Sequence, residues 1–210
     1  MPDYRWDPTG HRFRDAETGR FVSFTRVRSV QEELITSSRA YISGVAEQVS
    51  AGEISTDAWA AVMKQEIKDE YIRQAMLGRG GYLQMTPSDW GKVGSQIKEQ
   101  YKYLRGFIDE VAAGKVPPGM VDMRAQMYIN SAREAFETAN QKVQTEAGFD
   151  LEHWDLDSSV ENCPSCQEFA AMGWVKIEDD PYNGAFPGSG NTECKTSCHC
   201  SISYMKSEEA

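Results

Sequence analysis

Three observations predict a mainly α-helical fold class. Apolar residues recur at three- and four-residue intervals between residues 29 and 147, as in helices that bury one face. Residues 1–28 instead carry turn signals among arginines and aromatic residues, and all five cysteines fall between residues 163 and 200. We therefore expect an extended N-terminal arm (1–28), a helical bundle of about four helices (29–147) and a small Cys-rich α+β module (148–210).

The composition indicates a folded protein with an uneven distribution of charge. Of the 210 residues, 40% are hydrophobic, which is enough for a packed core. The net charge is −10, and residues 148–210 contain 12 acidic and 3 basic residues. A module with a net charge of −9 is repelled by the phosphates of nucleic acids. The composition therefore disfavours a nucleic-acid reader at this end of the chain.

The sequence contains no segment that predicts insertion into a membrane. No stretch approaches the roughly 18 apolar residues that a membrane span requires, and the first residues contain no apolar run. We therefore expect neither a membrane span nor a signal peptide, and synthesis in a reducing cytosol. In that compartment, clustered cysteines favour a metal over disulfide bonds.

The N-terminal arm repeats a short pattern. The segment Trp6-Asp-Pro-Thr-Gly-His-Arg-Phe13 is echoed by Asp15-Ala-Glu-Thr-Gly-Arg-Phe21, and each half places a turn before an arginine and a phenylalanine. These signals predict two short hairpin-like or extended pieces. Two interpretations are open. The arm binds a partner protein or nucleic acid through its arginines and aromatic rings, or it covers the core of its own protein.

Four helices are expected after the arm, each with its own start and stop signals. The third has the clearest start, with Thr86 as N-cap and Pro87 at the first helical position. The fourth follows Pro117 and Pro118. Glycines end the helices, which are expected at 29–52, 55–78, 86–114 and 117–148.

Two sets of residues in these helices carry specific expectations. Tyr41 falls on the apolar stripe of the first helix and is expected to be buried. Met120, Met123 and Met127 recur at helical spacing, which predicts packing in the core or at an interface.

The cysteines form two clusters, Cys163-Pro-Ser-Cys166 and Cys194-Lys-Thr-Ser-Cys198-His-Cys200. Two tight groups of thiols, separated by a Gly-rich loop, are what a tetrahedral zinc site requires. We predict a zinc-ribbon-like module with a structural zinc held by Cys163, Cys166, Cys194 and Cys198. Cys200 is the alternative fourth ligand. A module this small needs its metal in order to fold.

The sequence argues for a closed metal site. His199 is not expected to bind the metal, because on a strand it faces away from the side shared by the cysteines before and after it. A catalytic zinc needs an open position and a nearby general base. The His-x-Glu of deaminases is absent, since Trp and Asp follow His153, and Glu161 and Glu168 are expected to be solvated. We therefore predict no catalytic residues and no enzymatic activity.

The C-terminal motifs are similar to those of a known family. The order Trp154-Asp-Leu-Asp157, Cys163-x-x-Cys166, a Gly-rich segment, then Cys194-x-x-x-Cys198-His-Cys200 and a short strand resembles the C-terminal signature of phage head morphogenesis proteins. These are also called minor head or minor capsid proteins. The resemblance covers residues 124–206. In the family the second cluster reads His-x-x-Cys-x-Cys. Here Cys194 is the counterpart of that histidine, displaced by one residue, which leaves the fourth ligand open.

The resemblance implies a structural protein of the virion that is made in the host cytoplasm and has no general catalytic activity. It implies binding to portal or major capsid subunits during head assembly, with zinc as a structural staple. The N-terminal arm would then contact virion proteins or packaged DNA. The alternative is an accessory protein that binds nucleic acid through a zinc ribbon.

Overall fold

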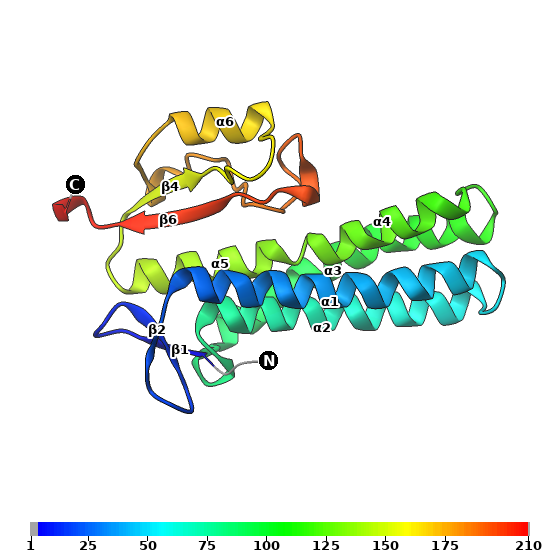
Figure 1. Ribbon diagram of the computed structural model, residues 1–210, viewed down its shortest axis with the longest axis horizontal. Coiled ribbons are helices and arrows are strands. Elements are labelled where there is room, and N and C mark those ends of the chain that lie inside the picture. Colours follow the sequence, from blue (N-terminus) through cyan, green and yellow to red (C-terminus); the bar gives the residue numbers. More distant parts are fainter. Residues whose placement is uncertain (1–3, 210) are drawn as a thin grey trace.

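The computed structural model describes residues 4–209 and is mainly helical (Figure 1). An elongated bundle of helices is flanked, at one end, by an N-terminal sheet and by the small Cys-rich α+β module. This level of the predicted fold class is confirmed. Within the described residues, no helix combines the length and the apolar content that crossing a bilayer demands. The bundle consists of α1 (Phe24–Ser50), α2 (Thr56–Arg79), α3 (Pro87–Ala112), α4 (Pro118–Asn130) and α5 (Arg133–Glu146).

The predicted N-terminal arm is a folded sheet and is not extended. Its strands are antiparallel, in the order β1-β2-β3, so the two predicted turns are hairpins. Trp6 and Phe13 pair across the first hairpin and are buried against Leu77 of α2 and Phe136 of α5. Burying these large rings stabilises the sheet on its own bundle. The strands are β1 (Tyr4–Asp7), β2 (Arg12–Asp15) and β3 (Phe21–Val22).

The first helix differs from its prediction at its start and on one face. It begins at Phe24 and not near Ser29, because the Ser23 side chain accepts a hydrogen bond from the backbone N–H of Arg26 at 3.2 Å. The prediction that Tyr41 is buried is wrong, since 53% of this residue is exposed. The adjacent Ile42 takes the inward position.

The predicted fourth helix is two helices, α4 and α5, which meet at Ser131. The Ser131 hydroxyl donates to the carbonyl of Tyr128 at 2.8 Å and accepts from the Tyr71 hydroxyl at 2.9 Å. The N–H of Ala132 bonds to the carbonyl of Ile129, three residues back. A serine that bonds a helix carbonyl competes with the regular backbone pattern and bends the chain. The bend separates α5, which lies beneath the module, from α4 (Figure 1).

The close approach of α2 to α5 organises the bundle. The helix α2 contacts α1, α3, α4 and α5, and its contact with α5 is the most extensive. Gly78 makes this approach feasible, because a Cβ at this position would overlap the carbonyl oxygen of Phe136 and lie 3.0 Å from its carbonyl carbon. The main core continues along the bundle and includes the fully buried Ile42, Trp59, Met63, Ile67, Leu104 and Phe107.

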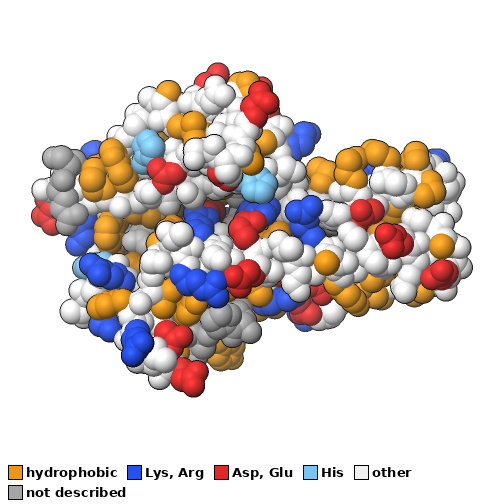
Figure 2. All heavy atoms as spheres, in the orientation of Figure 1, with side chains coloured by type: hydrophobic (Ala, Val, Ile, Leu, Met, Phe, Trp, Pro, Cys, Tyr) orange, Lys and Arg blue, Asp and Glu red, His pale blue; other side chains and the backbone are white. Residues whose placement is uncertain are grey.

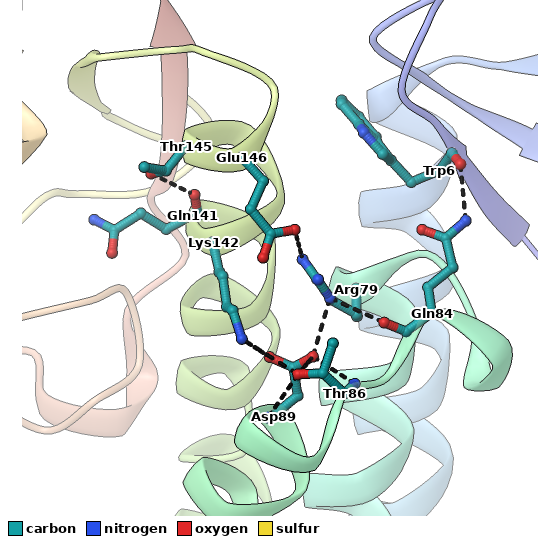
Figure 3. A network of polar contacts seen from close by, with 9 residues as sticks. All are labelled: Trp6, Arg79, Gln84, Thr86, Asp89, Gln141, Lys142, Thr145 and Glu146. Atoms are coloured by element: carbon teal, nitrogen blue, oxygen red, sulfur yellow. Dashed lines mark hydrogen bonds and ion pairs between the residues drawn. The ribbon is translucent and has the colours of Figure 1, made fainter.

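A polar network fixes the end of the bundle beside the N-terminal sheet (Figure 3). The buried Arg79 lies 3.1 Å from a carboxylate oxygen of Asp89 and 2.6 Å from one of Glu146. Asp89 also pairs with Lys142 at 2.5 Å and accepts from the N–H of Thr86 at 2.8 Å. Burial raises the pKa of Asp89, but the hydrogen bonds of Lys142 and Thr86 and the charge of Arg79 outweigh it, and the pKa lies below its usual value. Each charge is matched, so the network ties α2, α3 and α5 together.

The contact at Gly78 predicts a position-specific loss of stability. We expect Gly78→Ala to lower the free energy of unfolding by about 1–3 kcal/mol, because the added methyl group forces α2 and α5 apart. Urea denaturation followed by circular dichroism measures this change.

The matched control is Gly44→Ala in α1. A Cβ at Gly44 meets no atom within 4 Å, so alanine is expected to stabilise the helix by up to about 1 kcal/mol. Equal effects of the two substitutions would contradict a steric role for Gly78.

Candidate metal centre

The Cys-rich module is built around a second small sheet. Its strands are antiparallel in the order β5-β4-β6, and a short helix packs on β4. The short strand expected after Cys200 is present, whereas the helix was not predicted. The elements are β4 (Leu151–Asp155), α6 (Pro164–Ala171), β5 (Val175–Lys176) and β6 (Ser201–Met205). Short 3-10 helices in the described chain lie at Tyr82–Gln84, Ile177–Asp179, Lys195–Ser197 and Ser207–Glu209.

The first cysteine pair lies at the start of α6 and not in an isolated turn. Cys163 is the N-cap of this helix, Pro164 takes its first position, and Cys166 follows in the first turn. Pro164 is the start signal that identifies the helix in the sequence. Burial raises the pKa of Cys163, but hydrogen bonds from the backbone N–H groups of Cys166 and Cys194 outweigh it and hold the pKa below its usual value. Burial raises the pKa of Cys166.

The second cysteine cluster folds back onto the first and forms two overlapping groups of three. The sulfur atoms of Cys163, Cys166 and Cys194 lie within 4.8 Å of one another, as do those of Cys166, Cys198 and Cys200. The shared Cys166 sulfur is 3.7 Å from that of Cys194 and 3.6 Å from that of Cys198. Four thiolates around zinc, with bonds of about 2.3 Å, place their sulfurs roughly 3.8 Å apart. The clustered cysteines could therefore hold a metal ion.

The four predicted ligands all reach this cluster but do not form a single group. Cys163, Cys166 and Cys194 share one group, whereas Cys198 joins the other through Cys166. Cys194 and Cys198 flank a 3-10 turn, so the second pair comes from a turn and not from a strand as predicted. Cys198 lies next to Cys166, so the sulfur atoms of the other three predicted ligands all lie within 4.8 Å of the Cys166 sulfur.

The alternative ligand, Cys200, is buried in the same cluster and has a second contact. Its sulfur lies 3.4 Å from the side-chain oxygen of Asn162. A hydrogen bond between the thiols of Cys198 and Cys200 lowers the pKa of Cys200 to about 6 and raises the pKa of Cys198. His199 is exposed between the two buried cysteines, as the alternation of a strand predicts. Cys198 and Cys200 therefore face the same interior.

Aromatic rings complete the interior of the module. Trp154 of β4 is fully buried, with its ring centroid 4.9 Å from that of Phe169 and 5.2 Å from that of Tyr182. Cys166 and Cys198 belong to the same buried cluster. Thiols thus make up a large share of this small core, so a metal ion bound to them would stabilise the module.

Arg133 connects the metal-binding segment to the bundle. This buried side chain donates to both carboxylate oxygens of Glu32, at 2.8 and 2.6 Å, and to the carbonyl of Thr196 at 3.4 Å. Thr196 lies between Cys194 and Cys198. Sequence reasoning missed this contact, because Glu32 and Thr196 lie 101 and 63 residues from Arg133 along the chain.

His153, Asp155 and Ser203 come together in the module, but not in the geometry of a nucleophile and its base. His153 Nδ1 lies 2.7 Å from one oxygen of Asp155, and the Ser203 hydroxyl donates to the other oxygen. The serine therefore bonds the carboxylate, whereas an activated serine would bond the imidazole. Glu161 and Glu168 are exposed, as predicted.

Comparisons of the chain with protein-family models, with curated proteins and with solved structures find no match. The family resemblance of the C-terminal motifs therefore remains a proposal.

The shared position of Cys166 predicts a selective effect of metal loss. We expect Cys166→Ser, or treatment with a strong chelator, to remove bound metal and expose Trp154, while the helical circular dichroism persists. The bundle keeps its structure because its core is separate from that of the module. Metal content by mass spectrometry and tryptophan fluorescence report the two effects.

Cys200→Ser is the matched control. It is expected to retain the metal if Cys163, Cys166, Cys194 and Cys198 are the ligands, and to lose it if Cys200 is the fourth. An unchanged metal content in Cys166→Ser would contradict the site itself.

Proposed function

We propose that this chain is a structural protein of a phage head, a minor head or head morphogenesis protein, whose C-terminal module is closed by zinc. The observation that carries the proposal is the convergence of the five cysteines around Cys166 in an acidic module docked on a helical bundle. The residues that resemble the family signature lie in or beside this cluster. In this role the protein is made in the host cytoplasm and becomes part of the virion.

Zinc is the metal that the ligand set favours. Thiolates select zinc or iron–sulfur clusters among the common metals, and structural zinc sites have four closed ligands. Three of the cysteines, Cys166, Cys198 and Cys200, are buried. Glu161 and Glu168, the carboxylates considered as a general base, are exposed to solvent. These features support a staple and not a reaction centre.

An apolar face on α4 supports binding to other subunits. Met120, Met123 and Met127 are 40%, 50% and 37% exposed, so they do not belong to the core, and the interface interpretation of their spacing remains. The opposite face of α4 is buried through Val121 and Ala125. Apolar side chains are prominent at the free end of the bundle (Figure 2). Exposed methionines suit a surface that docks against portal or capsid subunits.

The proposal predicts that the chain is found in purified phage particles and that its methionine face is needed there. We expect Met123→Glu to lower incorporation by about tenfold, because a buried unpaired charge opposes docking. Quantitative mass spectrometry of purified particles measures incorporation.

Met172→Glu in the module is the control, since this methionine is similarly exposed, at 47%, but lies away from α4. Its incorporation is expected to equal that of the unmodified chain. Absence of the unmodified chain from particles would refute the proposed function.

The alternative is a nucleic-acid-binding accessory protein, and one observation favours it. The guanidinium groups of Arg12 and Arg14 lie 5.2 and 3.8 Å from the centroid of the exposed Phe21 ring, so the N-terminal sheet presents arginine beside an aromatic surface. Against it stands the net charge of −9 of residues 148–210.

A salt titration of DNA binding separates the two functions. For the structural protein we expect little binding to duplex or single-stranded DNA, and no steep dependence on salt. A nucleic-acid reader would lose affinity linearly on a log–log plot, with a slope set by the number of phosphates it neutralises. Such a slope, measured by fluorescence anisotropy, would favour the alternative.

A further inference from the structure

A cavity of about 570 Å³ lies where the N-terminal sheet, α5 and strand β6 meet. This volume is typical of sites that hold small molecules. The cavity is distinct from the cysteine cluster, and no part of the proposed function uses it. Six aromatic residues contribute to its lining: Trp6, Phe13, Phe21, Phe24, Phe149 and Tyr204.

The charge of the lining is opposite to that of the whole protein. Among the described residues that line the cavity, Arg12 is the one charged side chain and there is no aspartate or glutamate, although the chain has a net charge of −10. Lys206 lies close by, with its amine 5.4 Å from the centroid of the Phe149 ring. The lining therefore favours an anionic ligand.

Arg12 is available to bind such a ligand. Its neighbour Arg14 is paired with Asp7 at 2.7 Å and donates to the carbonyl of Gly19 at 2.9 Å. Arg12, by contrast, makes no ion pair with any residue in the described part of the chain. Figure 2 shows basic side chains next to apolar ones over this end of the molecule.

Two buried polar atoms of the lining lack hydrogen bonds. His11 Nδ1 and the Tyr204 hydroxyl have no hydrogen-bond partner among residues 4–209. Both atoms are covered by surrounding protein atoms, so neither contacts a ligand in the cavity, and Arg12 is the group left to bind its charge. His11 also has a φ of 48°, an uncommon conformation for a residue with a side chain. The hairpin turn thus holds the imidazole at the cavity in a strained backbone conformation.

We infer that this cavity binds a small anion that carries an aromatic ring. The ring packs among the aromatic side chains, where offset and edge-to-face contacts are favourable. The anionic group binds Arg12, which makes no ion pair with the described residues. The inference does not depend on the metal or on a role in the virion.

Adenosine monophosphate and phenyl phosphate are suitable probes, with adenosine, phenol and inorganic phosphate as partial ligands. Titration of the ¹⁵N-labelled full chain, followed by amide chemical shifts, should show saturable binding of a probe with a Kd below about 1 mM. The shifts should centre on residues 11–13 and 202–204. Each partial ligand is expected to bind at least about tenfold more weakly, because it lacks either the charge or the ring.

Arg12→Gln should weaken binding of the same probe about tenfold. Arg20→Gln is the matched control: Arg20 is exposed in the connection between β2 and β3 but does not line the cavity, so binding should not change. The spectra also report whether each variant is folded. Absence of saturable binding for both probes, or equal effects of Arg12→Gln and Arg20→Gln, would overturn the inference.

Discussion

At Gly78 the backbone of α2 meets the carbonyl group of Phe136 in α5 with no side chain between them. This spacing sets the position of α5, on which both flanking parts rest. On one side, Leu77 and Phe136 form the apolar surface on which Trp6 and Phe13 of the N-terminal sheet pack. On the other, α5 presents Arg133 and Gln141 to the module. A wider gap between the two helices would separate Leu77 from Phe136 and would also displace Arg133 and Gln141 from the module. Both changes would occur together, because packed interiors transmit displacements.

The N-terminal sheet and the module are attached to the bundle by different kinds of interaction. The N-terminal sheet shares one apolar cluster with the bundle, so its attachment comes from area removed from water. The module has an apolar core of its own and meets the bundle through polar groups, such as the Gln141 amide that donates to Glu152 at 2.9 Å. Burial raises the pKa of Glu152 and of the neighbouring Glu137, whose partner is Arg28. A buried polar contact stabilises a structure only while both partners are present. The attachment of the module to the bundle therefore depends on the exact placement of these polar pairs more than on the apolar area that it buries.

Local signals in the sequence were sufficient for the approximate extents of α2 and α3 and for the cluster of thiols, but not for α6, for the start of α1 or for the break between α4 and α5. Thr86 and Pro87 start α3 as predicted, and the two cysteine clusters meet at one place. Two features depended on contacts between distant residues and were missed. Tyr71 bonds Ser131 where the predicted fourth helix breaks, and Arg133 joins Glu32 to Thr196. The packing of the arm's aromatic rings against Phe136 agrees with one of the two interpretations left open, that the arm covers the core of its own protein. The two groups that share Cys166 likewise require the folded turn, since spacing alone cannot rank four ligands among five cysteines.

Both flanking parts lie at the same end of the bundle, and the other end is bare (Figure 1). The helix α1 has 27 residues and therefore extends roughly 40 Å at about 1.5 Å per residue. The bundle thus holds its bare end at a fixed distance from the N-terminal sheet and the module, whereas Met127 of the methionine face borders the module itself. Helices change length by whole residues, each of which also turns the helix by about 100°, so evolution can adjust this distance only in steps that also rotate the docking face.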